Sequence, residues 1–272
     1  MRFWKRKGAF PFSRLKEAGR DWVPPGDWPE PLHETEGRVK LMRDTSAARW
    51  LEERLWQWGN EGVPVGSIVP EGFEAYARIL HPAYKRPDGG GEEEPVRWST
   101  VAAWTGRVVH SQMQFERFAN LAQHEFPPWD SPPMQGVLPR GECERVAGHL
   151  RSFTSTPTSC WFGIWDGYGF FDPKRYSDVP RVRAQHRDYL LFRGPIDAVT
   201  GFAWGLSEQS PNLWWPEDEA WCVATDIDLS DTYIGGSDEC IDRVLADGKI
   251  EAFRTTLDAR VDIDGDTINL PA

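Results

Sequence analysis

The chain has 272 residues, of which 40 % are hydrophobic and 27 % charged, so it is long enough to bury a substantial core and typical of a soluble globular protein. Its 31 basic and 42 acidic residues give a net charge of −11, which argues against a nucleic-acid-binding protein because binding phosphates requires an excess of Lys and Arg. We find neither a transmembrane run of roughly 18 apolar residues nor a secretory signal, and therefore expect a cytoplasmic protein.

The four cysteines show no spacing typical of metal ligands or of a redox motif. Cys143 and Cys240 lie on apolar helical faces, and Cys160 and Cys222 lie in strand-like runs. We expect reduced, buried thiols and no metal or cofactor.

Residues 1–40 are predicted to form an irregular basic arm, and residues 41–272 a single domain. The first twenty residues hold seven Lys or Arg and one acid, and Pro24, Pro25 and Pro29 exclude a continuous helix further on. Such an arm is expected to remain solvated, to touch an anionic surface such as a membrane, or to fold back onto the acidic C-terminal part.

The first half of the chain alternates helical and strand-like patterns. An apolar stripe of Ala47, Leu51, Leu55 and Trp58 indicates a helix, and Ser111 with Gln114 fits a capping box at the start of another. The expected helices span 45–58, 97–105 and a segment that begins at residue 111, and the expected strands span 65–69 and 73–80. A Pro-rich connection at 126–141 follows.

The second half reads as a sheet with helices. Residues 160–165 form a continuous apolar run, typical of a strand covered on both faces, and 189–192 form another. Residues 220–228 alternate as a half-exposed strand does, and Ser237 is placed to cap a helix. Further helices are expected at 142–153 and 196–204. We predict an α+β fold: a mixed, mostly antiparallel sheet in the second half with helices packed on it, in one compact domain.

A search for catalytic patterns is negative. The chain has no H-E-x-x-H, G-x-S-x-G or Walker A sequence, and its six histidines are scattered singly. The acidic turn at 262–266 lacks the Gly and Glu that an EF-hand calcium loop requires. No catalytic residue is therefore assigned.

The most unusual stretch is 210–221, which holds three tryptophans and three consecutive acids. Such a cluster is either a wedge in the core or an exposed recognition surface. If the strands at 160–169, 189–195 and 210–236 lie side by side, their ends form one binding edge. The candidate binding residues are Trp165, Asp166, Tyr168, Arg193, Trp214, Trp215, Glu217, Asp218 and Tyr233. The competing interpretation places Trp214 and Trp215 in the core and the acids in water.

The segments 66–82, 160–169, 189–195 and 210–236 resemble the shared blocks of a family of actinobacterial proteins to which no activity is assigned. The resemblance spans residues 60–250 and excludes the arm. The alternation of short strands and helices with aromatic turns is also loosely similar to immunity proteins of the SMI1/KNR4-like superfamily.

The leading hypothesis is a non-enzymatic, cytoplasmic protein-binding module, immunity-like or regulatory, whose Trp-rich acidic surface would attract a basic partner. Trp, Tyr and Arg are the residue types that dominate binding energy at protein interfaces.

The alternative hypothesis is a hydrolase that acts on a glycan or small molecule in a Trp-lined cleft. Asp166, Glu217, Asp218 or Asp228 would supply the acid and the base. Glycoside cleavage needs two carboxyl groups about 5–10 Å apart, which neighbours in a turn do not normally provide.

Overall fold

The computed structural model describes residues 38–58, 62–119, 127–168, 176–184, 186–202 and 209–270. By its internal contacts the chain divides into two units, Met1–Glu30 and Pro31–Ala272, and every described residue belongs to the second unit. Most of the predicted N-terminal arm therefore lies outside the described residues. Its last residue, Lys40, begins a strand.

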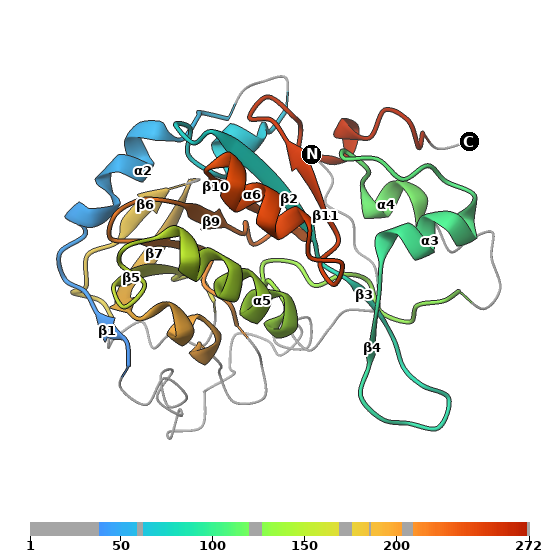
Figure 1. The fold of residues 1–272 in the computed structure, drawn as a ribbon, viewed down its shortest axis with the longest axis horizontal. Helices are drawn as coiled ribbons and strands as arrows, with labels where there is room; N and C mark the ends of the chain where they lie inside the picture. The colour runs from blue at the N-terminus through green and yellow to red at the C-terminus, as the bar shows by residue number, and fades with distance from the viewer. Residues whose placement is uncertain are drawn as a thin grey trace. The chain divides into compact units, whose positions relative to one another are not determined.

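A sheet of nine antiparallel strands forms the centre of the described unit (Figure 1). Eight strands follow one another in space: β1 (Lys40–Leu41), β7 (Arg187–Gly194), β5 (Cys160–Trp165), β8 (Leu213–Pro216), β9 (Cys222–Ala224), β10 (Asp231–Gly236), β2 (Ala75–Leu80) and β11 (Ala252–Thr255). The ninth, β6 (Val182–Ala184), pairs with the start of β7. The predicted α+β fold with a mostly antiparallel sheet is confirmed. The sheet also takes β1 and β2 from the first half of the chain.

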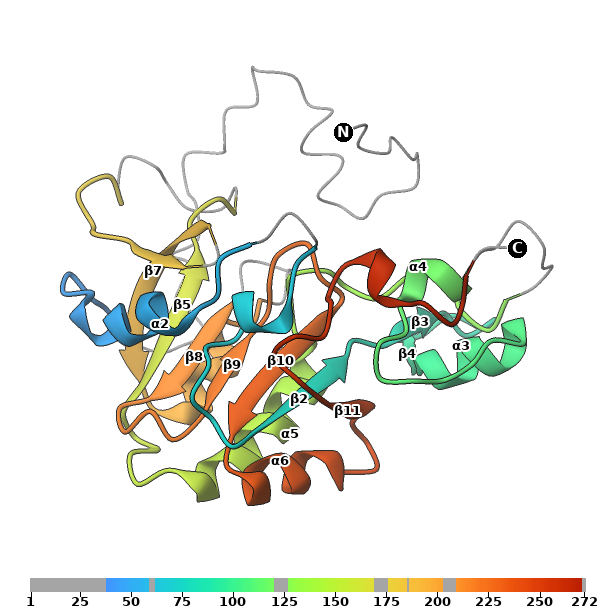
Figure 2. The same cartoon turned by 90° about the horizontal axis from the view of Figure 1, so that it is seen from above.

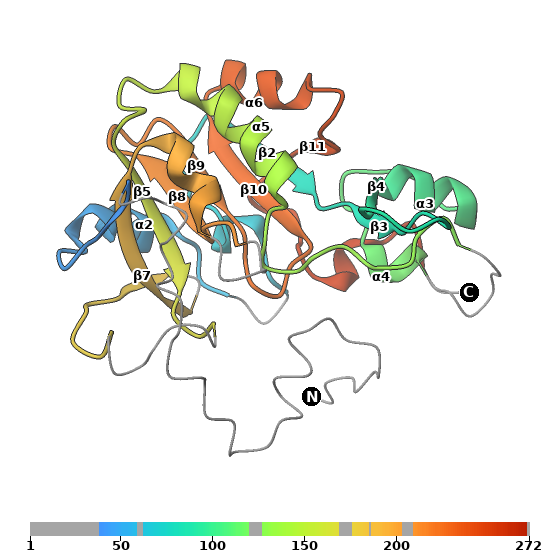
Figure 3. The same cartoon turned by 90° about the horizontal axis from the view of Figure 1, so that it is seen from below.

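Helices cover one face of the sheet and form the first core with it. Figure 3 shows α5 (Arg140–Leu150) and α6 (Asp238–Leu245) lying side by side over β2, β9 and β10. The 3-10 segment η6 (Ile196–Gly201) packs against α5. The first core includes Phe162, Leu190, Trp214, Val223 and Ile234 from the sheet, with Val146, Leu150, Ile241 and Val244 from the two helices. Each such aliphatic side chain stabilises the fold by about 1.5–3 kcal/mol when fully buried.

The opposite face of the sheet carries the second core. It is covered by α2 (Arg49–Arg54), which follows the short 3-10 segment η2 (Ser46–Ala48), and by the 3-10 segment η3 (Val65–Ser67) (Figure 2). The second core includes Trp161, Leu191, Leu213, Trp215, Cys222 and Tyr233 from the sheet, with Leu51, Val65 and Ile68 from the covering segments. Because both faces are covered, the central strands are apolar on both sides, as the run at 160–165 predicts.

A third cluster lies beside the end of β2. The hairpin of β3 (Ala83–Lys85) and β4 (Glu94–Val96) leads into α3 (Trp98–Thr105) and then α4 (Phe115–Phe118), which pack around Trp98, Phe115, Phe118 and Trp129. Arg78 of β2 joins this cluster to the sheet. It pairs with Asp231 and donates hydrogen bonds to the carbonyls of Ser111 and Met113.

Several predicted elements are confirmed. They are the strand at β5, the strand within β7, and the helix at α5, which the 3-10 turn η5 (Arg151–Phe153) extends. In α6, the side chain of Ser237 accepts a hydrogen bond from the backbone N–H of Cys240, as an N-cap does. The helix predicted at 196–204 is the 3-10 segment η6 as far as residue 201.

Other predicted elements are wrong. The apolar run at 65–69 begins as a 3-10 turn after Pro64 rather than a strand, and the Ser67 hydroxyl donates to the Pro64 carbonyl. The capping box at Ser111 does not form, because the backbone N–H of Gln114 donates to Asp266 instead of to the Ser111 side chain, and the helix begins only at Phe115. The strand predicted at 220–228 is shorter than expected, because only Cys222–Ala224 (β9) form a strand.

Candidate functional site

The structure divides the nine candidate residues among three places. Strands β5 and β7 pair from Cys160 opposite Gly194 to Trp165 opposite Tyr189, so Trp165 and Arg193 mark opposite ends of the pair. At about 3.4 Å per residue, these ends are roughly 14 Å apart. Trp165, Asp166 and Tyr168 lie at one end, and Arg193, Glu217 and Asp218 at the other. The nine residues therefore do not form one edge.

Trp214, Trp215 and Tyr233 are buried, so the expectation that they line an exposed surface is wrong. Trp214 packs edge-on against Trp221 in the first core, with ring centroids 5.3 Å apart. Trp215 packs edge-on against Trp50 in the second core, at 6.1 Å. The reason is geometric: successive residues of a strand point to opposite faces, and both faces of β8 are covered.

The end of the sheet at Trp165 carries a set of polar and aromatic groups that we call the Arg187 edge: Trp58, Trp165, Arg187, Asp226 and Asp228. Trp58 and Asp228 are exposed, Trp165 and Arg187 are partly buried, and Asp226 is buried. Arg187 donates to both carboxylate oxygens of Asp226, at 3.3 and 3.1 Å, and to Asp228 at 2.7 Å. Its guanidinium also lies 5.9 Å from the centre of the Trp165 ring. Two carboxylates and one aromatic ring thus hold the guanidinium in place.

Trp58 extends this edge. Its ring meets His186 edge-on at 5.0 Å, next to Arg187, and 41 % of the residue is exposed. The sequence placed Trp58 on the buried stripe of a helix, but α2 ends at Arg54 and the chain is extended from Leu55. The stripe therefore does not continue to Trp58, and the ring is left at the surface.

Two other predicted residues at this end of the sheet, Asp166 and Tyr168, make contacts within the protein that stabilise the fold. Asp166 pairs with Arg181 at 2.9 Å. The Tyr168 hydroxyl donates to the Gly136 carbonyl and accepts from the Asn212 amide, and burial raises the pKa of Tyr168 to about 12. Tyr168 therefore stays protonated and anchors the turn after β5.

The opposite end of β5 and β7 repeats the combination of arginine, tryptophan and acid. Arg193 lies 5.0 Å from the Trp161 ring centre and pairs with Glu217 at 2.9 Å. Asp218 accepts hydrogen bonds from the Thr154 hydroxyl and from the hydroxyl and backbone N–H of Ser155, each at 2.7 Å. Burial tends to raise the pKa of Asp218, but these hydrogen bonds outweigh it and the net shift is downward.

The carboxylates named for a hydrolase do not form a catalytic pair. Asp166 and Asp228 are each paired with an arginine at one end of the sheet, and Glu217 is paired with Arg193 at the other. Glycoside cleavage needs two carboxyl groups that face each other across the scissile bond, whereas each of these three carboxylates is bound to an arginine. The geometry therefore gives the hydrolase hypothesis no support.

The cysteines and the possible metal ligands do not form a catalytic or metal site among the described residues. All four cysteines are buried and none of them forms a disulfide, and burial raises the pKa values of Cys160 and Cys240 to about 12, which makes these two thiols poor nucleophiles. Within the described ranges, no three His, Cys, Asp or Glu side chains are grouped so that they could hold a metal ion.

No protein-family model, curated protein or solved structure matches this chain. Among the helices that the structure describes, none is both long enough and apolar enough to cross a membrane.

Proposed function

We propose that this protein is a non-enzymatic binding module for another protein, and that the Arg187 edge is the centre of its contact surface. The observation that carries the proposal is the arrangement of Arg187 between Asp226, Asp228 and Trp165, beside the exposed ring of Trp58. Trp and Arg are enriched among the residues whose truncation costs most at interfaces, about 2 kcal/mol or more each.

The rigidity of the edge favours binding. The Arg187 side chain is about one-fifth exposed and Asp226 is nearly buried, while 76 % of the Asp228 side chain is exposed. The guanidinium thus loses little further side-chain entropy when a partner docks, and Asp228 and Trp58 remain available for new contacts.

We place the partner among basic proteins, a class that includes the nuclease toxins neutralised by immunity proteins. The net charge of −11 supports this choice, because long-range attraction raises the association rate of oppositely charged proteins. Such steering weakens as salt screens the charges, so association is expected to slow sharply between low and physiological ionic strength.

The test is affinity capture from lysate of the native source with the wild-type chain and with Trp58→Ala. Trp58 is the variant of choice because its partial exposure makes it the least damaging tryptophan of the edge to truncate. One stoichiometric, basic protein is expected with the wild type and not with the variant. The association rate of the purified pair is then measured against salt concentration.

The matched control is Arg193→Ala, which removes an arginine that also lies over a tryptophan and pairs with an acid, but at the opposite end of β7. Capture by this variant should equal that of the wild type, and both variants should keep the wild-type circular dichroism spectrum. Equal capture by Trp58→Ala and wild type, or a salt-independent association rate, contradicts the proposal.

A further inference from the structure

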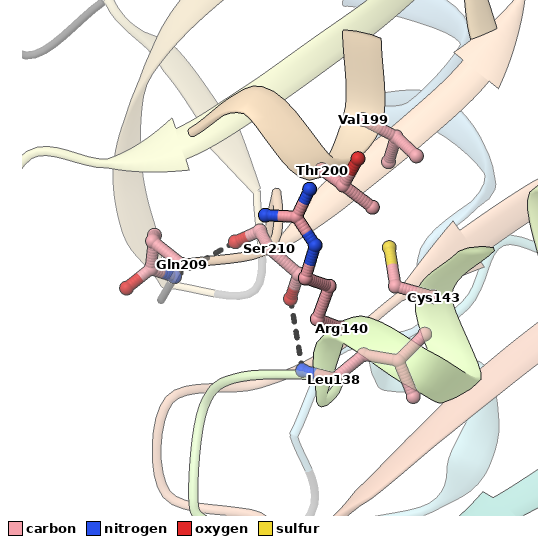
Figure 4. Close-up of a pocket in the computed structure, with 7 residues that line it drawn as sticks. All are labelled: Leu138, Arg140, Cys143, Val199, Thr200, Gln209 and Ser210. Carbon is pink, nitrogen blue, oxygen red and sulfur yellow. Dashed lines mark hydrogen bonds between the residues drawn. The ribbon is translucent and has the colours of Figure 1, made fainter. Parts of the chain in front are cut away.

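The pocket beside the start of α5 does not provide a ligand site (Figure 4). It has room for about one water molecule. The charged group that lines it, Arg140, has a half-exposed side chain that already pairs with Glu144. The hairpin of β3 and β4 instead offers a covalent reaction of the chain with itself.

The chain contains four Asp–Gly pairs, a dipeptide prone to isomerise without a catalyst. They begin at Asp88, Asp166, Asp247 and Asp264. Because glycine has no side chain, its backbone nitrogen can approach the carboxyl group of the aspartate before it. The reaction needs a carboxyl group that no other group holds, a glycine N–H that donates to no carbonyl, and a backbone that is free to change its dihedral angles. The tertiary structure therefore decides which pair reacts.

The pair Asp88–Gly89 meets these conditions. It lies in the turn that joins β3 and β4, which projects away from the sheet in Figure 1, and both residues are exposed. Within the described part of the chain, the Asp88 carboxylate has no hydrogen-bond or ion-pair partner, and the Gly89 N–H makes no backbone hydrogen bond. The turn is closed by the next residue, since the N–H of Gly90 donates to the Pro87 carbonyl at 2.9 Å.

The backbone around Asp88 is also free to move. Nothing lies within 4 Å of the position that a Cβ atom on Gly89 would take, so no neighbour restrains the turn from that side. Two more glycines follow, and Gly90 and Gly91 adopt φ angles of 79° and 130°. A run of glycines crosses between backbone conformations at low cost, which lets the attacking nitrogen reach the carboxyl group.

The other three pairs are held by contacts within the fold. Asp166 pairs with Arg181 at 2.9 Å, and the ring of Trp165 lies against Gly167. These contacts fix both the carboxylate and the backbone that would have to turn toward it.

The two pairs near the C-terminus are held in the same manner. The carboxylate of Asp247 accepts a hydrogen bond from His149 at 2.8 Å. Asp264 pairs with Arg117 at 2.8 Å, and the N–H of Gly265 donates to a backbone carbonyl at 2.9 Å. A carboxylate oxygen that accepts such a bond is poorly placed to leave as water.

We propose that Asp88 isomerises to isoaspartate in the folded protein, with water as the only co-reactant. The nitrogen of Gly89 forms a bond to Cγ of Asp88, and the carboxyl hydroxyl leaves with the amide proton as water. Water then adds to the backbone carbonyl carbon of the resulting succinimide ring and breaks the original peptide bond to Gly89. The chain afterwards continues through Cγ, the backbone carbonyl has become a free carboxylate, and the mass is unchanged.

The reaction adds one methylene group to the main chain of the hairpin tip. The tip is separate from the Arg187 edge, and the proposal does not depend on the proposed function.

The test incubates the full chain for several weeks at a mildly acidic pH at which its circular dichroism spectrum is unchanged. Aspartate carboxyls are partly protonated there and can lose water. Peptide mapping with electron-transfer fragmentation then locates isoaspartate. It is expected to accumulate at residue 88, whereas Asp166, Asp247 and Asp264 remain aspartate. In denaturant all four pairs should react at comparable rates, because the contacts that hold three of them are lost.

Gly89→Val should slow the reaction at Asp88 several-fold, because it places a branched side chain beside the attacking nitrogen, in space that is open in the fold. Gly248→Val is the matched control: it makes the same change in another Asp–Gly pair, also in open space, and should leave the rate at Asp88 unaltered. The proposal is overturned by the absence of isoaspartate at residue 88 in the folded chain, by equal rates at all four pairs in the folded chain, or by a rate in Gly89→Val equal to that of the wild type.

Discussion

His81 illustrates how burial sets the chemistry of a single residue. The side chain is fully buried where β2 ends, with Nδ1 2.7 Å from the Met134 carbonyl and Nε2 2.8 Å from the Thr232 hydroxyl. A carbonyl only accepts, so Nδ1 donates to it, and the neutral Nε2 accepts from Thr232. Thr225 continues the chain at 2.7 Å from Thr232. A second proton on the ring would break the bond at Nε2.

We therefore expect His81 to make stability depend on pH. Burial lowers the pKa of His81 from 6.5 to about 4, so between these values the unfolded chain binds a proton that the folded chain does not. The contribution is complete above pH 6.5 and is lost as pH falls toward 4, by about 3 kcal/mol in total. Denaturant unfolding at a series of pH values measures this loss.

The control for this prediction is His81→Gln, which keeps a hydrogen-bonding side chain but does not titrate. Its free energy of unfolding at pH 7 is expected to be lower than that of the wild type, because the Gln amide fits the two partners imperfectly. The difference between the two proteins should shrink between pH 6.5 and 4. A constant difference would show that His81 does not titrate as described.

At the scale of elements, two helices of similar length begin in different ways. The N-terminus of α6 is capped by Ser237, its own neighbour in sequence. The N-terminus of α3 is capped by Glu251, whose carboxylate accepts from the backbone N–H groups of Trp98 and Ser99 at 2.6 and 2.8 Å. Glu251 lies just before β11, so the start of α3 depends on a segment about 150 residues further along the chain.

Removal of either cap is expected to destabilise the protein. Ser237→Ala should lower the free energy of unfolding by about 1 kcal/mol, the usual cost of losing a serine cap. Glu251→Ala should cost more, about 2 kcal/mol, because it removes two hydrogen bonds to a charged acceptor. Ser99→Ala, a change within the first turn of α3 that keeps the cap, should cost less than either. Chemical denaturation of the three variants measures these free energies of unfolding. If Glu251→Ala lowers the free energy of unfolding no more than Ser99→Ala does, Glu251 does not act as a cap.

At the scale of the molecule, the sheet joins parts of the chain that are far apart in sequence. Strand β2 from the first half lies between β10 and β11 from the C-terminal part, pairing Ala77 with Ile234 on one side and with Arg254 on the other. Because these partners come from different halves of the chain, neither half alone carries a complete sheet. The long loops between the strands must close before the pairing can form.

We expect deletion of residues 248–272 to expose β2. This truncation removes β11 and the Glu251 cap, so the amides of β2 and α3 should exchange with deuterium much faster, whereas β5 and β7 keep their partners. Deletion of Gly89–Gly91 at the hairpin tip, where no other part of the described chain lies close, is the control and should leave exchange in the sheet unchanged. Unaltered protection of β2 in the truncated chain would contradict this account.

The candidate site was predictable only in part. Trp165 and Asp166 follow from an apolar strand that ends in a polar turn, a pattern contained within a few residues. Arg187 and Trp58 were missed, because their importance depends on Asp226 and His186, which meet them only after the sheet has formed.

By itself, the sequence determined the α+β class, the apolar strands β5 and β7, and the capped helix α6, because periodicity, apolar runs and caps depend on near neighbours. The tertiary structure alone decided that Trp214 and Trp215 enter opposite cores, since a tryptophan in a strand is exposed or buried according to what covers its face of the sheet. It likewise decided the place of β2 and the arrangement of the Arg187 edge, because both arise from contacts between segments that are distant in sequence.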